Sequence, residues 1–289
     1  MKIDGKTKLL GLIGNPVEHT LSPVIHNTLA HEMGINACYV PFLVLEEAVH
    51  TAVKGAYALN IQGMNVTVPH KQAVIDCLSG IDPLAEQIGA VNTLVRTEGG
   101  FTGYNTDALG FIRELKQENV SIEGETAVIL GAGGASRAVV FSLAKEGIGK
   151  MYLLNRSVEK AEKLAKQVND CFGKQIVFPL AMDQYRAIEE DRLLAVQCTS
   201  VGLSPECDRC VITDDAFYRK VHTGVDLIYK PSKTLFMKLV EKNGGNAYNG
   251  LKMLFYQGVT AFELFLNVQV TEEVAKKVYQ RLCEELEHA

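Results

Sequence analysis

AVILGAGGASRAV, residues 127–139, is the stretch that decides the fold of this chain. It opens with Val128, Ile129 and Leu130, an apolar run typical of a parallel-sheet strand that is covered on both faces. The glycine-rich turn at 131–134 lets a backbone approach a ligand closely, and the helix that follows directs its amides at this turn, as phosphate sites do. The third position of the G-x-G-x-x-G pattern is Ser136, so a tight structural turn is the alternative to a dinucleotide site. The strand–turn–helix context favours the dinucleotide.

Size and charge indicate a protein whose partners are small molecules. The chain has 289 residues, 47% of them hydrophobic, which suffices for two domains, although one large domain is the alternative. Its net charge is −5 and its lysines and arginines are dispersed, which argues against a nucleic-acid or membrane-surface partner. We find no apolar stretch long enough for a membrane span and no secretory signal in the first residues, so we expect a cytoplasmic protein.

Seven cysteines, an odd number, suit a reducing compartment better than a disulfide framework. Cys207 and Cys210 form a C-x-x-C pair, but no second pair or histidine pair completes a ligand set. Reduced loop cysteines are therefore favoured over a metal or redox site, and we predict no metal.

Strands and helices alternate along the chain, which predicts an α/β protein with a doubly wound, mainly parallel sheet. Residues 1–106 are expected to form a substrate-binding domain that C-terminal helices within 247–289 complete, and 107–246 a Rossmann-type dinucleotide-binding domain. Strands are expected at 9–13, 37–43, 63–69, 151–157, 176–178, 193–197 and 223–227, with a hairpin over 90–97 and 101–107. Helices are expected from Ser22 to Gly34, over 46–59, after Pro69, over 106–118, 134–147, 158–170, 230–245, 251–266 and 271–286.

The end of the second strand of the dinucleotide unit indicates the cofactor. NAD-binding folds usually carry an acidic residue there, whereas a 2′-phosphate requires a cation. This chain has Asn155-Arg156-Ser157, with Lys160 one turn later and no carboxylate. Arg156 can bind a phosphate and stack on adenine, so NADP is favoured over the alternative of a solvated arginine.

Four residues of the first domain point to anion binding and proton transfer. Thr20 and Ser22 place hydroxyls at a helix N-terminus, where a carboxylate is favoured, although Ser22 alone also fits a simple N-cap. Lys71 is expected in the first turn of a helix, where the dipole opposes its charge and favours a general acid or base. Asp107 is expected at another helix start, where a carboxylate is favoured. Their joint meaning depends on whether they are close in space.

Six motifs together resemble the shikimate dehydrogenase family over nearly the whole chain. They are GNPVEHTLSPVIHN, NVTVPHK, GAVNT, GYNTD, GAGGASRA and NGLKMLFYQG, in the family's order. The resemblance implies two domains with substrate and nicotinamide meeting in the cleft between them. It also implies reversible hydride transfer between NADPH and the keto carbon of 3-dehydroshikimate, a step of chorismate and aromatic amino acid biosynthesis.

The resemblance also implies roles residue by residue. Lys71 falls at the catalytic lysine, which donates a proton to the forming alkoxide, and Asp107 at its partner. The positions implied for substrate binding are Thr20, Ser22, Thr67, Asn92, Tyr229 and Gln257. The positions implied for cofactor binding are Gly131, Ala132, Gly133, Gly134, Ala135, Asn155, Arg156, Ser157, Thr199, Ser200 and Gly250.

The chain departs from the family pattern at several positions, and these put the substrate preference in doubt. Thr20 stands where serine is usual, Gln197-Cys198 precede Thr199-Ser200 in place of an asparagine-rich strand end, Ala108 follows Asp107, and Lys252 replaces a small residue. A quinate/shikimate dehydrogenase that uses NAD or NADP is therefore one alternative, and a non-catalytic dinucleotide sensor is another. Monomer and homodimer are both compatible with the sequence.

Overall fold

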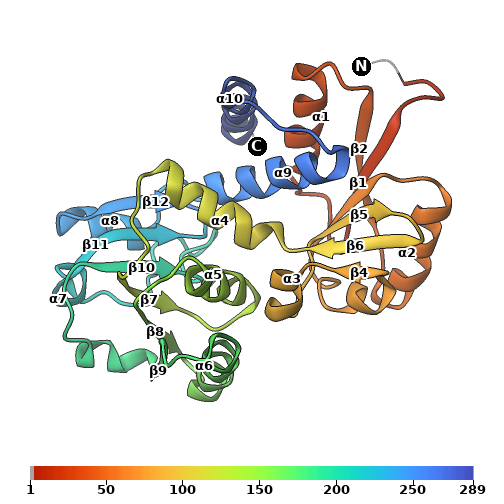
Figure 1. The fold of residues 1–289 in the computed structure, drawn as a ribbon. Helices are drawn as coiled ribbons and strands as arrows, with labels where there is room; N and C mark the ends of the chain where they lie inside the picture. The colour runs from red at the N-terminus through yellow and green to blue at the C-terminus, as the bar shows by residue number, and fades with distance from the viewer. Residues whose placement is uncertain (1–2, 289) are drawn as a thin grey trace. The chain divides into compact units, whose positions relative to one another are not determined.

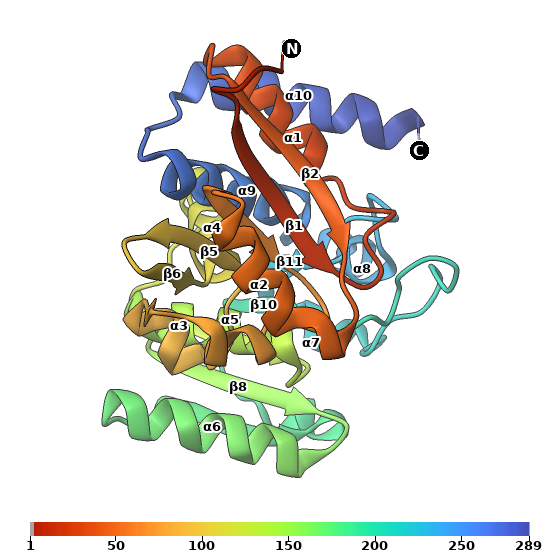
Figure 2. The same cartoon turned by 90° about the vertical axis from the view of Figure 1, so that its right-hand side faces the viewer.

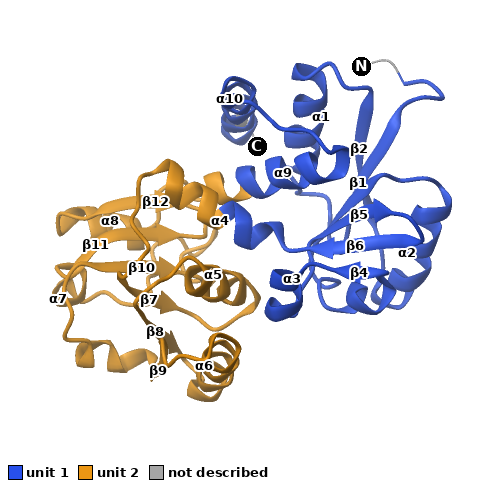
Figure 3. Cartoon of the chain, viewed as in Figure 1, with its two compact units in different colours: residues 1–110, 255–289 blue, residues 111–254 orange. Residues whose placement is uncertain are grey.

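The chain divides into two compact units in the computed structural model, which describes residues 3–288 (Figure 3). Unit 1 comprises the residues up to Gly110 together with those from Phe255 onward, and unit 2 comprises Phe111–Leu254. The sequence placed the two boundaries at 106 and 247. Both observed boundaries fall inside helices, α4 (Thr106–Gln117) and α9 (Leu251–Leu266), so composition shifts and linkers could not mark them.

Unit 1 is built on a mixed six-stranded sheet of order β2-β1-β3-β5-β6-β4 (Figure 1). Its strands are β1 (Lys8–Gly14), β2 (Ala37–Leu43), β3 (Gly63–Val66), β4 (Gly80–Ile81), β5 (Thr93–Thr97) and β6 (Gly100–Tyr104). Its remaining elements are α1 (Ser22–Glu32), α2 (Val49–Ala58), α3 (Pro83–Ile88), α10 (Glu272–His288) and the 3₁₀ helices η1 (Glu46–Ala48) and η2 (Ala73–Cys77). β1 pairs with β2 and β3 in parallel, whereas β5 pairs with β3 and β6 antiparallel, as the expected hairpin requires.

Unit 2 is a doubly wound sheet of six parallel strands in the order β12-β11-β10-β7-β8-β9. Numbered from β7, this is the 3-2-1-4-5-6 order of dinucleotide-binding folds, read from the other edge. The strands are β7 (Thr126–Leu130), β8 (Lys150–Asn155), β9 (Val177–Ala181), β10 (Leu193–Gln197), β11 (Val221–Asp226) and β12 (Asn246–Asn249). The helices are α5 (Gly134–Lys145), α6 (Val158–Phe172), α7 (Asp215–Tyr218), α8 (Leu235–Lys242) and the 3₁₀ helix η3 (Met182–Ala187). The Rossmann-type prediction is confirmed.

Burial explains why each unit holds its sheet. Every residue of β10 is buried, and so are four of the five residues of β7, as expected for strands covered on both faces. α6 turns its buried stripe, which includes Leu164 and Val168, to β8 and β9, and Figure 2 shows this helix alongside β8. In unit 1, Figure 2 shows α1 beside β1 and β2, and α1 packs on α10. In both units, helices thus pack on the sheet and help to hold its strands in place.

Two predicted elements have other bounds in the structure, and one strand was not predicted. The strand expected over 63–69 ends at Val66. The helix expected over 230–245 begins only at Leu235, because the Thr234 hydroxyl bonds Asp226 at 2.7 Å and caps the helix by accepting from the Met237 amide. The sequence analysis also missed β12, a four-residue edge strand whose polar sequence has no apolar run.

Candidate active site

Six of the predicted residues lie on segments that leave or enter one edge of the unit 1 sheet, whose strands Figure 1 shows. Because β1 and β3 are parallel neighbours, their carboxyl ends meet at this edge. β5 runs antiparallel to β3 and begins there, with Thr93 opposite Asn65, and β6 ends there, with Tyr104 opposite Thr93. The segments that leave or enter this edge carry Thr20, Ser22, Thr67, Lys71, Asn92 and Asp107.

Lys71 and Asp107 form an ion pair with 2.7 Å between Nζ and Oδ2. Their side chains are 32% and 23% exposed, so a small molecule can reach both. The Val91 amide donates to the Lys71 carbonyl at 2.8 Å, which ties the lysine backbone to the segment before β5. The closeness that the sequence left open is therefore present.

The expected helix start at Lys71 is wrong. Residues 68–72 form a turn, and η2 begins only at Ala73. The buried His70 anchors this turn, because its ring nitrogen bonds the Val44 carbonyl at 2.7 Å. No helix dipole therefore acts on Lys71 from its own segment, and the charge that bears on its ammonium is the Asp107 carboxylate.

Asp107 lies where the sequence predicted, in the first turn of α4. Asn105 caps this helix, since its side-chain oxygen accepts from the Ala108 amide at 3.1 Å, and its amide donates to the Ala90 carbonyl at 2.9 Å. A carboxylate at this position is stabilised by the helix N-terminus. Asp107 is thus suited to hold a positive charge beside it.

Thr20 and Ser22 present two hydroxyls at the N-terminus of α1. Ser22 is not the N-cap; Leu21 occupies that position, and Ser22 is the first helical residue. The Thr20 hydroxyl instead accepts from the Ser22 amide at 3.3 Å and lies 3.2 Å from the Ser22 hydroxyl. Two adjacent hydroxyls at a helix N-terminus form a site that favours an anion such as a carboxylate.

The other predicted substrate residues of unit 1 are Thr67 and Asn92 at this edge and Gln257 on α9. Thr67 packs against Gly14 at the end of β1, where a Cβ on Gly14 would meet its methyl group at 2.2 Å. Asn92 is buried, and within the described residues all bonds of its side chain use the oxygen, which leaves its amide nitrogen for a ligand. Gln257 lies on α9 beside Gly258, and a Cβ on Gly258 would touch Ile25 of α1 at 3.0 Å.

In unit 2, the glycine-rich loop is braced by Ser136 and Asn155. The Ser136 hydroxyl donates to the Gly131 carbonyl at 2.6 Å and accepts from the Gly133 amide at 3.3 Å, so serine at this position closes the loop. The Asn155 oxygen accepts from the Ala132 amide at 3.1 Å, and its amide donates to the Ser157 carbonyl. Asn155 thus links the loop to the end of β8.

The loop leaves room for phosphate. A Cβ on Gly133 or Gly134 would meet nothing within 4 Å, and Ala135 is exposed in the first turn of α5, whose leading amides have no helical partner. Gly131 has φ +110°, and its Cα faces the Thr199 methyl group closely enough that a Cβ would lie 2.9 Å away. The open space, the free amides and the helix N-terminus fit a dinucleotide pyrophosphate.

Arg156 supplies an exposed cation at the end of β8. Its guanidinium makes no hydrogen bond or ion pair with any residue in 3–288. No carboxylate occupies the strand end, so the arrangement fits a nucleotide that carries a 2′-phosphate.

The remaining predicted residues of unit 2 have structural partners as well. Gln197 accepts from both the Thr199 amide and the Thr199 hydroxyl at 2.7 Å, so Thr199 is held by Gln197, and Ser200 is exposed. A Cβ on Gly250 would lie 2.1 Å from the Leu227 carbonyl oxygen, which shows that backbone packing requires this glycine. Tyr229 is half-buried, and burial raises the pKa of its phenol, so this residue stays a neutral hydrogen-bond donor.

Sequence reasoning missed part of the buried layer under the site. It noted that Asn65 and Thr67 share a face but gave Asn65 no role, and it did not single out Thr93 or Thr106. These three side chains form a hydrogen-bonded group with Asn92. The available signal was polar residues at positions where the strand pattern expects apolar ones.

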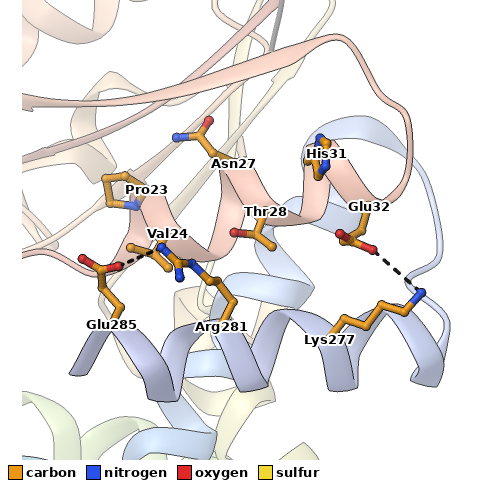
Figure 4. A pocket seen from close by; sticks show the side chains of 9 residues that line it. All are labelled: Pro23, Val24, Asn27, Thr28, His31, Glu32, Lys277, Arg281 and Glu285. Carbon is orange, nitrogen blue, oxygen red and sulfur yellow. Dashed lines mark hydrogen bonds and ion pairs between the residues drawn. The ribbon is translucent and has the colours of Figure 1, made fainter. Parts of the chain in front are cut away.

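A separate surface pocket of about 450 Å³ lies between α1 and α10 (Figure 4). Its lining includes Asn27, His31 and Arg281, and ion pairs cross or flank it, among them Lys277–Glu32 at 3.8 Å. None of its lining residues is a predicted site residue.

Within 3–288, no group of three or more potential ligand residues could hold a metal, and no helix is long and apolar enough to cross a membrane. None of the seven cysteines, all of which lie within the described residues, forms a disulfide, and the Cys210 thiol lies 3.1 Å from the Tyr218 hydroxyl.

Comparisons with known proteins find relatives over nearly the whole chain. Residues 12–94 match the family model described as shikimate dehydrogenase substrate binding domain, and residues 114–188 match shikimate / quinate 5-dehydrogenase. A curated relative from Desulforamulus reducens, named shikimate dehydrogenase (NADP(+)), is 41% identical over 97% of each chain. The solved shikimate 5-dehydrogenase of Listeria monocytogenes, in complex with shikimate and NAD, is 30% identical over 96% of this chain and 98% of that one, with a TM-score of 0.89. The Thermus thermophilus enzyme, in complex with NADP(H) and shikimate, is 31% identical over 96% and 100%, with a TM-score of 0.82.

Proposed function

The chain belongs to the shikimate dehydrogenase family, and on this premise we propose that it catalyses the reversible, NADP-dependent reduction of 3-dehydroshikimate to shikimate. This is an oxidoreduction of a CH–OH group and a step of the shikimate pathway to chorismate and the aromatic amino acids. The observation that carries the proposal is the Lys71–Asp107 ion pair, which is partly exposed at the sheet edge.

Lys71 transfers the proton in the proposed reaction. NADPH, when bound, supplies the hydride to the keto carbon. The Lys71 ammonium gives its proton to the carbonyl oxygen as the alkoxide forms, so the hydroxyl product leaves a neutral amine. In the oxidation direction the amine takes the proton back. Asp107 holds the ammonium and a substrate hydroxyl in place.

The substrate carboxylate is assigned to the hydroxyls of Thr20 and Ser22 at the start of α1. Thr67, Asn92 and Gln257 are assigned to the ring hydroxyls, since each offers a polar group near this edge. Tyr229, in unit 2, is assigned to the carboxylate. These roles follow the family positions, and the local geometry described above supports those in unit 1.

NADP is assigned to unit 2, and the chemistry of its residues fits the cofactor. The loop of Gly131, Ala132, Gly133, Gly134 and Ala135 is assigned to the pyrophosphate, since Gly133 and Gly134 leave open space beside the leading amides of α5. Asn155, Arg156 and Ser157 are assigned to the adenosine 2′-phosphate, and Thr199, Ser200 and Gly250 to the nicotinamide end. We accordingly assign substrate binding to unit 1 and cofactor binding to unit 2, with activity in the cytoplasm as a monomer or homodimer.

Quinate remains a second candidate substrate, because the family model of residues 114–188 includes quinate dehydrogenases and Thr20 adds a methyl group at the carboxylate site. An assay that crosses shikimate and quinate with NADP⁺ and NAD⁺ separates the candidates. We expect the highest kcat/KM for shikimate with NADP⁺. Higher kcat/KM with quinate and NAD⁺ would overturn the substrate and cofactor assignment, and binding of NADPH without turnover of either substrate would favour a sensor.

A further inference from the structure

Thr93 is a buried hydroxyl without a role in the proposed reaction. It is the first residue of β5 and is 0% exposed. A valine would fill the same space without the cost of burying a polar group, which requires hydrogen bonds to offset it. The hydrogen bonds of the Thr93 hydroxyl are therefore expected to have a role that valine could not fill.

The Thr93 hydroxyl lies at the centre of a network of buried polar groups. Its oxygen accepts from the Asn65 amide at 3.1 Å, lies 3.0 Å from the Asn92 side-chain oxygen and lies 2.9 Å from the Thr106 hydroxyl. Asn65 is held in turn by the Tyr39 hydroxyl, which donates to it at 2.8 Å. All five side chains are at most 4% exposed, so water does not compete for these bonds.

The network reaches the ion pair through Thr106 and Asn92. Thr106 begins α4 directly before Asp107, and the Asn92 oxygen accepts from its amide at 2.7 Å and from its hydroxyl at 3.2 Å. The direction in which Asp107 leaves the helix start therefore depends on where Asn92 and Thr93 hold Thr106.

The same short segment also holds the lysine. Val91, two residues before Thr93, donates its amide to the Lys71 carbonyl. Residues 90–93 thus fix both partners of the ion pair: Lys71 through its backbone, and Asp107 through the first turn of α4.

We propose that Thr93 is a positioning residue for the proton-transfer pair: its hydroxyl fixes the Asn92 side chain and the start of α4, and so holds the Asp107 carboxylate at hydrogen-bonding distance from Lys71. The inference rests on the proposed function for its kinetic consequence. Its structural part, the effect of Thr93 on the ion pair, concerns the protein without substrate and can be measured separately.

The kinetic test compares Thr93→Val, which removes the hydroxyl, with Thr93→Ser, which keeps it. We expect Thr93→Val to lower kcat about 10- to 100-fold, since small misplacements of reacting groups have effects of this size. The KM for NADP⁺ should stay at the wild-type value, the pH profile of kcat should shift, and Thr93→Ser should restore both kcat and the profile. Thr223→Val, a buried strand threonine of unit 2, controls for the loss of a buried hydroxyl as such.

A second measurement does not require turnover. The rate at which an amine-reactive ester modifies Lys71, read by peptide mass spectrometry, should rise in Thr93→Val because a loosened Asp107 protects the ammonium less. It should stay at the wild-type rate in Thr93→Ser and Thr223→Val. If Thr93→Val does not fold, Thr106→Val removes the other hydroxyl of the Thr93–Thr106 hydrogen bond. It should give the same changes in kcat, pH profile and Lys71 labelling.

The outcomes separate the two claims. A folded Thr93→Val with wild-type kcat, pH profile and Lys71 labelling would overturn the positioning role, even if its thermal stability falls. A wild-type protein that turns over neither substrate would overturn the proposed function, while the labelling rates would still decide the role of Thr93.

Discussion

The Lys71 Nζ lies 2.7 Å from the Asp107 Oδ2, although 36 residues separate the two along the chain. Both side chains are partly exposed, and an ion pair of this kind contributes little to stability, about 0 to 1 kcal/mol. Its geometry nevertheless depends on three strands and a helix start that meet at one sheet edge. Because the ion pair stabilises the fold so little, a role in catalysis explains its arrangement better than a role in stability does.

Arg156 should set the preference for NADP⁺. Replacing it by alanine removes the exposed, unpaired cation at the end of β8. We expect the KM for NADP⁺ to rise about 10-fold, the size of one charge-assisted hydrogen bond, with little change for NAD⁺. Steady-state kinetics with both cofactors measure this. Lys174→Ala, an exposed cation after α6, is the control, and an equal effect on both cofactors would remove Arg156 from the 2′-phosphate site.

Glu114 should make the stability of the protein depend on pH. Its carboxyl group is buried in α4, and neither oxygen has a hydrogen-bond partner within the described residues. Burial raises its pKa to about 8; the neighbouring Glu118 adds to the rise, while Lys252 and, more weakly, the Met253 amide lower it. Lys252 itself is paired with Glu118.

The folded pKa of Glu114 lies above its ordinary value of 4.5, so the folded state binds this proton more tightly than the unfolded state does. The contribution of Glu114 to the free energy of unfolding, on the order of 4 kcal/mol, is therefore complete below about pH 4.5 and is lost as the pH rises toward 8. Urea unfolding of Glu114→Gln should show a weaker fall of stability over this range than the wild type. Glu162→Gln, an exposed glutamate, should behave like the wild type, and parallel curves for Glu114→Gln and wild type would contradict the burial argument.

Gly250 should be required for folding as well as for any contact with the cofactor. Gly250→Ala would place a Cβ 2.1 Å from the Leu227 carbonyl oxygen, so the backbone must shift. We expect a loss of about 1 to 3 kcal/mol in the free energy of unfolding without any ligand present. Gly55→Ala, in α2 with nothing within 4 Å, is the matched control and should be neutral or stabilising. An unchanged stability with a raised KM for NADP⁺ would instead make Gly250 purely a cofactor contact.

The parts of the fold that were predictable are those with strong local patterns. The apolar run before Gly131 and the alternation of strands and helices indicated the doubly wound unit, and the helix expected over 106–118 placed Asp107 at a helix start. β12 lacked any apolar run, because a short edge strand with the sequence Asn-Ala-Tyr-Asn needs no buried face of its own.

The sequence indicated candidate site residues but not the local structure that holds them. The turn around Lys71 was mistaken for a helix start because Pro69 resembles a first helical residue, whereas the contact of His70 with Val44, which anchors the turn, joins distant segments. The network around Thr93 was missed for the same reason: its members lie on three different strands and a helix, and only the sheet register brings them together.

The most direct test of the account is the kcat for shikimate oxidation of Lys71→Met, measured by the formation of reduced nicotinamide, with Lys54→Met as a control for loss of an exposed lysine. We predict a fall of kcat by about 10²- to 10⁴-fold for Lys71→Met, with NADPH binding retained and the control unchanged. A folded Lys71→Met enzyme with wild-type kcat would contradict the assignment of proton transfer to the Lys71–Asp107 pair.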